Sequence, residues 1–182
     1  MPGPVFLEGA TVELRTVEEE DLPYLQARVN DQAIRRPIGR STPVNADQER
    51  SFYENVVCAD DSVDLLIARD GEAVGMISLN PIRQEVDSAE LGYWLAPEHH
   101  GEGYTSEAAA LLVRYGFEQL GLNRIYAHVF AFNDPSRRLL EGLGFVQEGT
   151  LREAAFVDGE RVDAEVYGLL RREWADGGTD RR

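Results

Sequence analysis

Residues 90–107 read Glu90-Leu-Gly-Tyr-Trp-Leu-Ala-Pro-Glu-His-His-Gly-Glu-Gly-Tyr-Thr-Ser-Glu107, and this stretch decides the fold. Its first part alternates with a period of two, which predicts a strand over 88–96 that Pro97 ends. From Thr105 the apolar residues recur with helical spacing, which predicts a helix to about residue 120, just before a glycine. The sequence therefore predicts a strand, a short loop and a helix in succession.

The loop between them, His100-Gly101-Glu102-Gly103-Tyr104, is suited to binding an anion. Its two glycines permit positive φ angles and a close approach of the backbone to a ligand. The first N–H groups of the following helix lack internal partners and carry a partial positive charge, so they favour a phosphate or diphosphate. On these residues alone, a plain strand-to-helix turn is an equal alternative.

Two better-known phosphate loops are excluded by single positions. The dinucleotide fingerprint requires a third glycine where position 106 is serine, and the Walker loop requires a lysine, which the chain lacks. Any phosphate site here therefore belongs to another class.

Composition indicates one soluble domain. The chain has 182 residues, 43% of them hydrophobic, without an apolar run near the ~20 residues that span a membrane. The first residues lack the features of a signal peptide, and the single Cys58 excludes an internal disulfide and a cysteine metal cluster. These features lead us to expect a cytoplasmic protein that does not associate with membranes.

The charge excludes nucleic acid as the main partner, because the net charge is −15 and no basic stripe is present. The acidity has two interpretations: it steers a cationic substrate, or it forms a solvated surface suited to high salt, as in halophilic proteins. All 18 basic residues are arginine, and the complete absence of lysine favours the second interpretation. In molar salt, moreover, charges are screened within ~3 Å, so long-range steering of a substrate would matter little.

The rest of the chain predicts an α/β (α+β) fold in one domain, residues 1–174, with a polar tail over 175–182 that we expect to be disordered. About seven strands form a mixed, mostly antiparallel sheet, and about four helices accompany it. The step from 88 to 130 is expected to be a right-handed parallel crossover, with its loop at the carboxyl end of a strand. The other predicted elements are a strand before Arg15, helices over 16–29 and 45–57, a hairpin about Asp70-Gly71, a strand over 123–130, a helix with Asp134 as N-cap, and closing strands over 145–157 and 161–170.

Three motifs in this order resemble the GCN5-related N-acetyltransferase (GNAT) superfamily, in particular its ribosomal-protein alanine acetyltransferase (RimJ/RimL) branch. The resemblance covers about residues 5–171. The motifs are Glu90-Leu-Gly-Tyr-Trp-Leu with His99-His-Gly-Glu-Gly-Tyr-Thr-Ser-Glu-Ala108, then Asn133-x-x-Ser136-x-Arg138-x-x-Glu141-x-x-Gly144-Phe145, then Gly149-Thr-Leu-Arg152 to Asp158-Gly159 with Asp163 and Tyr167.

The resemblance implies acetyl-CoA as the co-substrate and no metal. Its pyrophosphate would bind at the loop, and its pantetheine arm would lie along the strand before it like an added strand. Asn133 would bind the arm, Ser136 would approach the thioester sulfur, and Arg138 would meet a phosphate. The implied donor-binding residues are Trp94, Leu95, Ala96, His100, Gly101, Glu102, Gly103, Tyr104, Thr105, Asn133, Ser136 and Arg138.

Three positions depart from the family pattern. His100 stands where the loop usually begins with glutamine or arginine, or with tryptophan before glycine in this branch. Thr105 replaces a glycine or alanine. The last hairpin carries Ala154-Ala155-Phe156 where the branch can place a carboxylate, so a base at that position is excluded.

Acetyl transfer requires a neutral amine and a protonated leaving thiolate, and two residues are candidates for these tasks. Glu90 is the candidate base, acting through water, with a surface carboxylate as the alternative. Ser136 is the candidate acid, with helix capping as the alternative. Tyr93 and Tyr167 are held in reserve, and His128 is interpreted as a satisfied, half-buried histidine in a strand. His99 and His100 are adjacent, so their side chains diverge, and we do not expect a metal site.

The acceptor is expected to be the N-terminal α-amine of a protein, because an α-amine titrates at ~7.7–8.0 and a lysine amine at ~10.4. The alternatives are a small-molecule amine, such as a polyamine, amino acid or aminoglycoside, and a non-catalytic CoA-binding module. The acceptor site would be formed by residues around 30–45 and the last hairpin. The sequence gives no indication of the oligomeric state.

Overall fold

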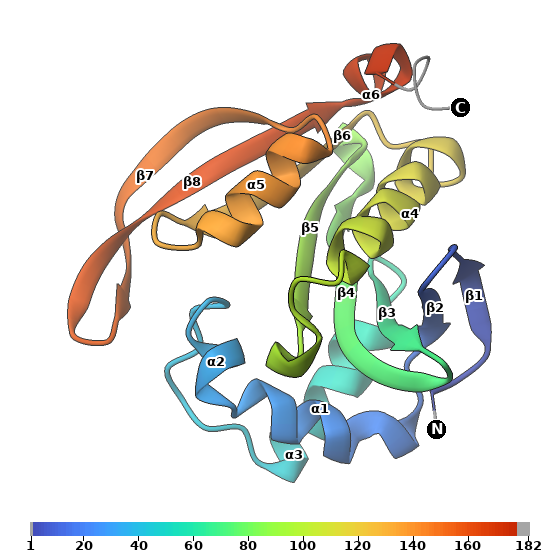
Figure 1. The fold of residues 1–182 in the computed structure, drawn as a ribbon, viewed down its shortest axis with the longest axis vertical. Coiled ribbons are helices and arrows are strands. Elements are labelled where there is room, and N and C mark those ends of the chain that lie inside the picture. Colours follow the sequence, from blue (N-terminus) through green and yellow to red (C-terminus); the bar gives the residue numbers. More distant parts are fainter. Residues whose placement is uncertain (1, 178–182) are drawn as a thin grey trace.

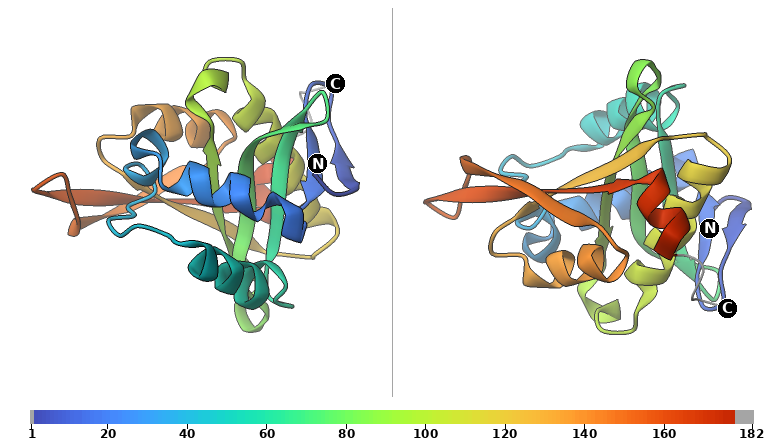
Figure 2. Two further views of the ribbon diagram at one scale, coloured as in Figure 1. Left: turned by 90° about the horizontal axis from the view of Figure 1, so that it is seen from below. Right: turned by 90° about the horizontal axis from the view of Figure 1, so that it is seen from above.

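The computed structural model describes residues 2–177, which form one mixed eight-stranded sheet with helices on both faces (Figures 1 and 2). The strands lie in the order β1-β2-β3-β4-β5-β6-β8-β7. Within residues 2–177, β5 and β6 pair in parallel and the other neighbouring strands pair antiparallel, as predicted. The strands are β1 (Val5–Glu8), β2 (Glu13–Thr16), β3 (Val63–Arg69), β4 (Glu72–Arg83), β5 (Ser88–Leu95), β6 (Arg124–Phe130), β7 (Val146–Val157) and β8 (Glu160–Leu170).

Six α-helices and four short helical turns accompany the sheet in the described residues. None of the helices between residues 2 and 177 is long and apolar enough to cross a membrane. The helices are α1 (Leu22–Val29), α2 (Gln32–Arg35), α3 (Ala46–Phe52), α4 (Tyr104–Glu118), α5 (Asp134–Gly142) and α6 (Arg171–Gly177), and the turns are η1 (Glu19–Asp21), η2 (Tyr53–Val57), η3 (Gln84–Val86) and η4 (Pro97–His99).

The sheet buries apolar side chains on both faces, because successive strand residues point in opposite directions. On one face, Ile67 and Ile77 join the main core with Leu112 and Phe117 of α4. On the other, Leu66 packs with α1 in a smaller core. Both panels of Figure 2 place α3 and α5 on opposite sides of the sheet.

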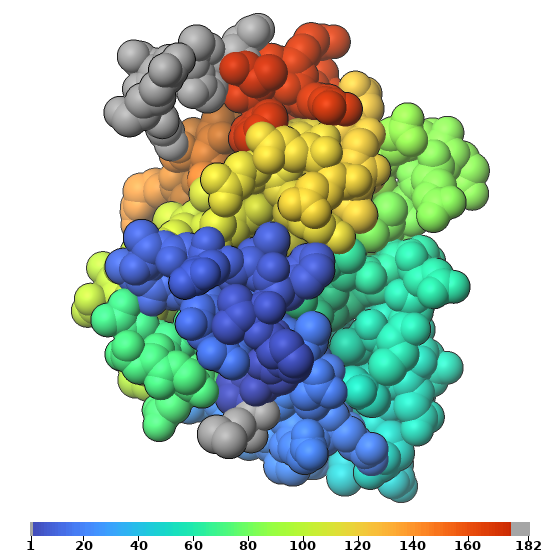
Figure 3. Space-filling model, turned by 90° about the vertical axis from the view of Figure 1, so that its right-hand side faces the viewer, coloured from blue at the N-terminus to red at the C-terminus, as the bar shows by residue number. Residues whose placement is uncertain are grey.

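The hairpin of β1 and β2 lies beside α4 (blue and yellow in Figure 3). The carboxylate of Glu107, in the first turns of α4, accepts hydrogen bonds from the backbone N–H groups of Ala10 and Thr11. The ring of Phe6 meets that of Tyr115 edge to face, with centroids 5.1 Å apart. The first strands therefore contact α4 both in its first turn, at Glu107, and near its C-terminal end, at Tyr115.

The parallel pair β5–β6 separates soon after it begins. Glu90 pairs with Tyr126, but beyond that point β5 continues to Leu95 and β6 to Phe130 without pairing to each other. Antiparallel strands bond through alternate residues, and the Ala96 N–H donates to Val74 O on the β4 side. The backbone groups of Tyr93 and Leu95 therefore face the gap between β5 and β6.

Three differences from the predicted fold have local causes. The Gly9 N–H donates to Val12 O, which closes a turn that separates β1 from β2, so the sheet has eight strands instead of about seven. A second difference is α2, in a segment where no helix was predicted. The third is α6, which makes residues 175–177 helical; the remainder of the predicted tail, 178–182, lies outside the described residues.

The hairpin of β7 and β8 projects from the body as an arm (Figure 1). β7 is an edge strand, and its residues 146–154 are all exposed. The tip of the arm nevertheless contacts the body, because Arg36, just after α2, forms an ion pair with Asp158 at 2.5 Å.

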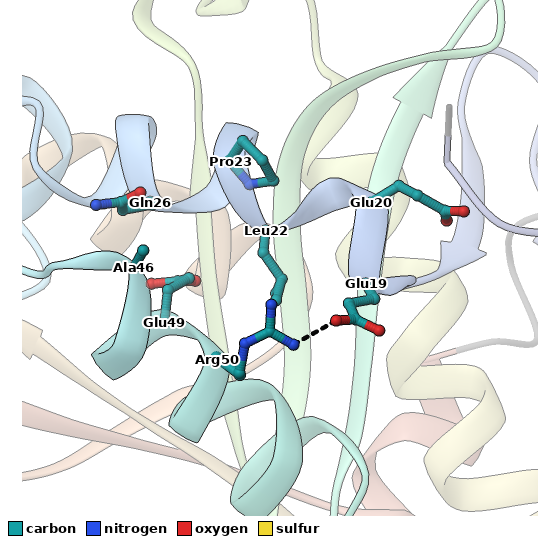
Figure 4. Close-up of a pocket in the computed structure, with 8 residues that line it drawn as sticks. All are labelled: Glu19, Glu20, Leu22, Pro23, Gln26, Ala46, Glu49 and Arg50. Carbon is teal, nitrogen blue, oxygen red and sulfur yellow. Dashed lines mark hydrogen bonds and ion pairs between the residues drawn. The ribbon is translucent and has the colours of Figure 1, made fainter.

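A cavity of about 360 Å³ between α1 and α3 contains a buried carboxylate, that of Glu49 (Figure 4). Glu49 is 4% exposed, and its side chain makes no hydrogen bond within residues 2–177. Burial raises the pKa of Glu49, although the charge of Arg40 partly opposes this effect. The charged form of Glu49 therefore costs stability near neutral pH.

Replacement of Glu49 with glutamine should stabilise the fold at pH 7 by about 1 kcal/mol, at the low end of the cost of an unpaired buried polar group. The gain should shrink as the pH falls through the usual range of a carboxyl group, because the raised pKa keeps the folded wild type protonated there. Denaturant unfolding at pH 7 and pH 4 measures this. Glu20→Gln, an exposed change on the same cavity wall, is the control for net charge. Equal stability of the two variants at pH 7 would contradict the expectation.

Candidate active site

A second cavity, of about 870 Å³, follows the gap between β5 and β6. It is lined by α2, β5, the loop before α4, β6 and the first turns of α5. Ala96 is fully buried and Glu102 is exposed, and neither lines the cavity. The predicted site residues that do line it are Glu90, Trp94, Leu95, His100, Gly101, Gly103, Tyr104, Thr105, Asn133, Ser136 and Arg138.

One end of the cavity is the tip of α4. Gly101 and Gly103 have φ angles of +87° and +81°, a conformation that glycine adopts without strain. The Glu107 N–H donates to Gly103 O, which is the first bond of the helix, so the N–H groups of residues 104–106 have no helical acceptor. These amides and the helix dipole form an anion site.

Two observations refine the predicted anion site. The His100 N–H donates to Pro97 O at 3.2 Å, so this amide, predicted to bind phosphate, already has a partner. Arg138 is exposed on α5, lines the same cavity and forms no ion pair within residues 2–177. The tip of α4 and Arg138 together fit a ligand with several phosphates.

The edge of β5 is partly covered by the protein itself. His100 Nε2 lies 2.9 Å from Leu95 O, and because a carbonyl can only accept, Nε2 is the donor. The backbone groups of Tyr93 stay open to the gap. An extended ligand could therefore pair with β5 as an added strand, with His100 at its far end.

A hydrogen-bonded pair stands on the face of the sheet that α4 and α5 cover. Tyr93 Oη lies 2.6 Å from Ser136 Oγ. The N-cap of α5 is Asn133, which accepts from the Ser136 N–H at 3.3 Å, so the prediction that Asp134 is the N-cap is wrong by one residue. The Ser136 hydroxyl is therefore not a capping group, and it is available at the cavity wall.

Burial raises the pKa of Tyr93 to about 12, and the hydrogen bond with Ser136 opposes that effect. Tyr93 therefore keeps its proton at every pH at which the fold is expected to work. A protonated tyrosine can donate to Ser136 and leave the serine proton directed elsewhere in the cavity.

A second pair stands on the opposite face, which α1 and α3 cover. His128 Nδ1 lies 2.7 Å from Glu90 Oε1, and both side chains are about one-third exposed, at 38% and 32%. The sequence interpretation of His128 as a partnered strand histidine missed that it lines the cavity. The parallel register could have revealed the pair: Glu90 lies opposite Tyr126, and His128 is two residues further on the same face.

One of the two segments predicted to build the acceptor site, residues around 30–45, lines the cavity, whereas the last hairpin contributes none of its lining residues in the described part of the chain. The α2 region contributes Ala33, Ile34, Pro37 and Ile38 to the wall. The guanidinium of Arg36 lies over the Phe132 ring at 4.2 Å as well as pairing with the tip of the β7–β8 arm. The mouth is therefore largely apolar and is held in place by one arginine.

No metal site is found in residues 2–177, where no three histidine, cysteine, aspartate or glutamate residues cluster suitably. His99 and His100 diverge: His100 bonds to Leu95 O, and the His99 ring lies 6.5 Å from that of Tyr104, centroid to centroid. The polar groups that line the cavity include hydroxyl, imidazole, carboxylate and backbone groups.

Known proteins with similar sequences and folds agree with this geometry. Residues 11–146 match the acetyltransferase (GNAT) domain family. The uncharacterised N-acetyltransferase p20 of Bacillus licheniformis is 34% identical over 167 residues, 89% of this chain and 94% of that protein. YdaF of Bacillus subtilis (strain 168), provisionally named a ribosomal N-acetyltransferase, is 42% identical over 105 residues, which cover 58% of this chain and 57% of YdaF.

Among solved structures, spermidine N-acetyltransferase from Vibrio cholerae, in complex with CoA and spermine, has a TM-score of 0.86 and 26% identity. The similarity covers 91% of this chain and 99% of that one. The described residues thus combine the family's sheet with an anion-binding helix tip and an open strand edge. The chain therefore belongs to the GNAT family, and it is an acetyl-CoA-dependent N-acetyltransferase.

Proposed function

We propose that the enzyme acetylates the N-terminal α-amine of a protein or peptide. The observation that supports this is the composition of the acceptor side of the cavity, where Glu90 is the one carboxylate among the lining residues in 2–177. The rest of that wall is mainly apolar, with Ile34 and Ile38 from the α2 region. One acidic group suits a substrate with one amine next to an uncharged side chain.

An α-amine also suits the modest catalytic groups of the cavity. It is neutral in a sizeable fraction at neutral pH, whereas a lysine amine is almost fully charged. Positioning beside the thioester can then supply much of the rate. The provisional name of YdaF, a ribosomal N-acetyltransferase, is consistent with such an acceptor.

The second candidate acceptor is a polyamine. It is favoured by the net charge of −15, which attracts cations, and by the similarity to the Vibrio cholerae spermidine enzyme. Against it, each further ammonium group of a polyamine would need its own carboxylate in the cavity wall, and Glu90 alone lines it in the described residues.

The two candidates are separated by initial rates of thiol release from acetyl-CoA. The acceptors are short peptides with a free N-terminus, the same peptides with a blocked N-terminus, and spermidine. We expect the free peptides to exceed spermidine at least tenfold in kcat/KM and the blocked peptides to be inactive. A preference for spermidine would overturn the proposal in favour of the second candidate.

Two variants test whether the number of carboxylates in the cavity wall decides the choice of acceptor. Ile38→Glu places a second carboxylate at the mouth and should raise the ratio of spermidine to peptide turnover. Val86→Glu adds the same charge at an exposed position, 62% accessible, outside the cavity, and should leave that ratio unchanged.

We also propose that the acidic surface serves solvation at high salt and not substrate attraction. Rates measured at low salt and at ~1 M salt address this, since charges are screened within ~3 Å in molar salt. The proposal predicts that peptide turnover is retained or increased in molar salt. A fall that follows ionic strength in KM alone would indicate steering of a cationic acceptor instead.

A further inference from the structure

We propose that His128 is the base that removes the proton from the attacking amine, and that Glu90 is a positioning residue that holds the imidazole in place. The proposal concerns the acetyl-transfer step itself, so it does not depend on which amine the enzyme accepts. It assigns a role to a residue that the sequence interpretation had set aside.

The tautomer of His128 follows from its partner. A carboxylate can only accept a hydrogen bond, so His128 Nδ1, 2.7 Å from Glu90 Oε1, carries the hydrogen of the neutral ring. The lone pair is then on Nε2, which has no partner within residues 2–177. Because His128 lines the cavity and is 38% exposed, this lone pair is accessible to a substrate.

Within residues 2–177, His128 and Glu90 form an ion pair with each other and with no other charged side chain. On β8, the residue opposite His128 is Val166, and on β6 its neighbour on the same face is Tyr126, whose ring meets the imidazole edge to face at 5.8 Å. Glu90 is therefore the one carboxylate recorded in contact with His128 among the described residues. An imidazole also matches a proton leaving an amine near neutral pH better than a carboxylate does.

The alternation of side chains along β5 and β6 places the two hydrogen-bonded pairs on opposite faces of the sheet, and the separation of the two strands leaves a gap between them. Tyr93 and Ser136 stand on the face of α4 and α5, and Glu90 and His128 stand on the face of α1 and α3. A thioester carbonyl lying in the gap would have the base on one side and the serine hydroxyl on the other. The amine can then arrive from one face while the sulfur leaves toward the other.

The step is balanced in atoms and charge. The amine nitrogen forms a bond to the carbonyl carbon, and the carbon–sulfur bond breaks with its electron pair on sulfur. One proton passes from nitrogen to His128 Nε2, and one passes to sulfur from the Ser136 hydroxyl. Solvent then takes the proton from His128 and restores that of Ser136, so a neutral amine gives amide and thiol with no net proton change.

The kinetic test compares His128→Gln, Glu90→Gln and the double variant over pH 6–9, with the best acceptor found for the wild type, whether peptide or polyamine. His128→Gln should lower kcat/KM about tenfold at pH 7, with the loss closing toward pH 9, where hydroxide can take the proton from nitrogen in place of the imidazole. Glu90→Gln should behave similarly, and the double variant should be no worse than His128→Gln, because the two residues act as one unit. Affinity for acetyl-CoA should be unchanged in all three.

Added imidazole should restore part of the activity of His128→Ala, which a merely structural role would not allow. Tyr126→Phe, which alters the packing against His128 without lining the cavity, should retain wild-type kinetics. A pH-independent loss without rescue, or a loss in Glu90→Gln with none in His128→Gln, would overturn the proposal.

Nuclear magnetic resonance tests the proposal without turnover, so it is independent of the acceptor. The chain has three histidines, which simplifies the ¹⁵N imidazole spectrum. We expect neutral His128 to carry its hydrogen on Nδ1 and His100 to carry it on Nε2, and Glu90→Gln should shift the His128 signals alone. A neutral His128 with its hydrogen on Nε2 would rule the residue out as the base.

Discussion

Replacement of Ser136 with alanine should lower kcat about 100-fold and leave the dissociation constant of acetyl-CoA nearly unchanged. Loss of a positioned acid costs 10²–10⁴-fold in general, and we expect the low end because water can replace the hydroxyl. The change should be clean, because the Asn133 side chain accepts from the Ser136 backbone N–H and caps α5 without the hydroxyl. Steady-state kinetics with a saturating acceptor measure the effect.

A change of leaving group tests whether the loss of activity in Ser136→Ala comes from the missing proton donor. An acyl donor such as 4-nitrophenyl acetate, whose leaving group needs no proton, should show a much smaller loss in Ser136→Ala than acetyl-CoA does. Tyr93→Phe keeps the hydroxyl of Ser136 but removes its hydrogen-bond partner at 2.6 Å, so it should lower kcat only a few-fold. Equal losses with both donors would mean that Ser136 positions the substrate and does not protonate sulfur.

The pH dependence of these rates should not arise from Tyr93. Burial raises its pKa to about 12, so Tyr93 stays protonated from pH 6 to pH 9. The corresponding contribution to stability is constant below the usual tyrosine range, near pH 10, and is lost as the pH rises from there to about 12.

Replacement of Gly103 with valine should weaken acetyl-CoA binding about 10- to 100-fold. A φ of +81° costs a non-glycine residue about 1–2 kcal/mol, and more for a β-branched side chain, so relief of the strain would turn the amides of the α4 tip away from the phosphates. Titration calorimetry with acetyl-CoA measures the loss.

Gly71 provides a matched control for this change. Its φ is +80°, and a Cβ added at either glycine would meet nothing within 4 Å. Gly71→Val at the β3–β4 turn should therefore lose similar stability and keep its affinity for acetyl-CoA. If the two variants bound acetyl-CoA equally well, the helix tip would not be the phosphate site.

The sequence predicted the central part of the site because its patterns are long and uninterrupted. The strand over 88–96 and the helix from Thr105 correspond to β5 and α4, within one residue at the start of each. The glycine loop between them was predicted from chemistry alone, through the free amides of a helix terminus. The predicted N-cap, Asp134, was wrong by one residue because asparagine and aspartate cap helices about equally well. The sequence alone does not show which of the two side chains accepts a hydrogen bond from the first N–H groups of the helix.

The parts that escaped prediction are contacts between segments far apart in the sequence. Tyr93 and Ser136 are 43 residues apart, and Glu90 and His128 are 38 residues apart, so each pair needs the strand register or the helix position to be known. The ion pair of Arg36 with Asp158 spans 122 residues. Hydrophobic periodicity reports contacts between residues a few positions apart, so it could not reveal pairs that are this far apart in the sequence.

The early separation of β5 and β6 has a mechanical consequence. Direct pairing between the two halves of the sheet is limited to Ser88–Glu90 with Arg124–Tyr126, so β6, β8 and β7 are joined to the rest through a short seam and through packing. An acetyl-CoA molecule lying along β5 would form hydrogen bonds with the backbone of β5 and fill the space between β5 and β6. Bound substrate would then restrict motion between the two halves of the sheet, and the protein would be most rigid when its reacting groups must be held in position.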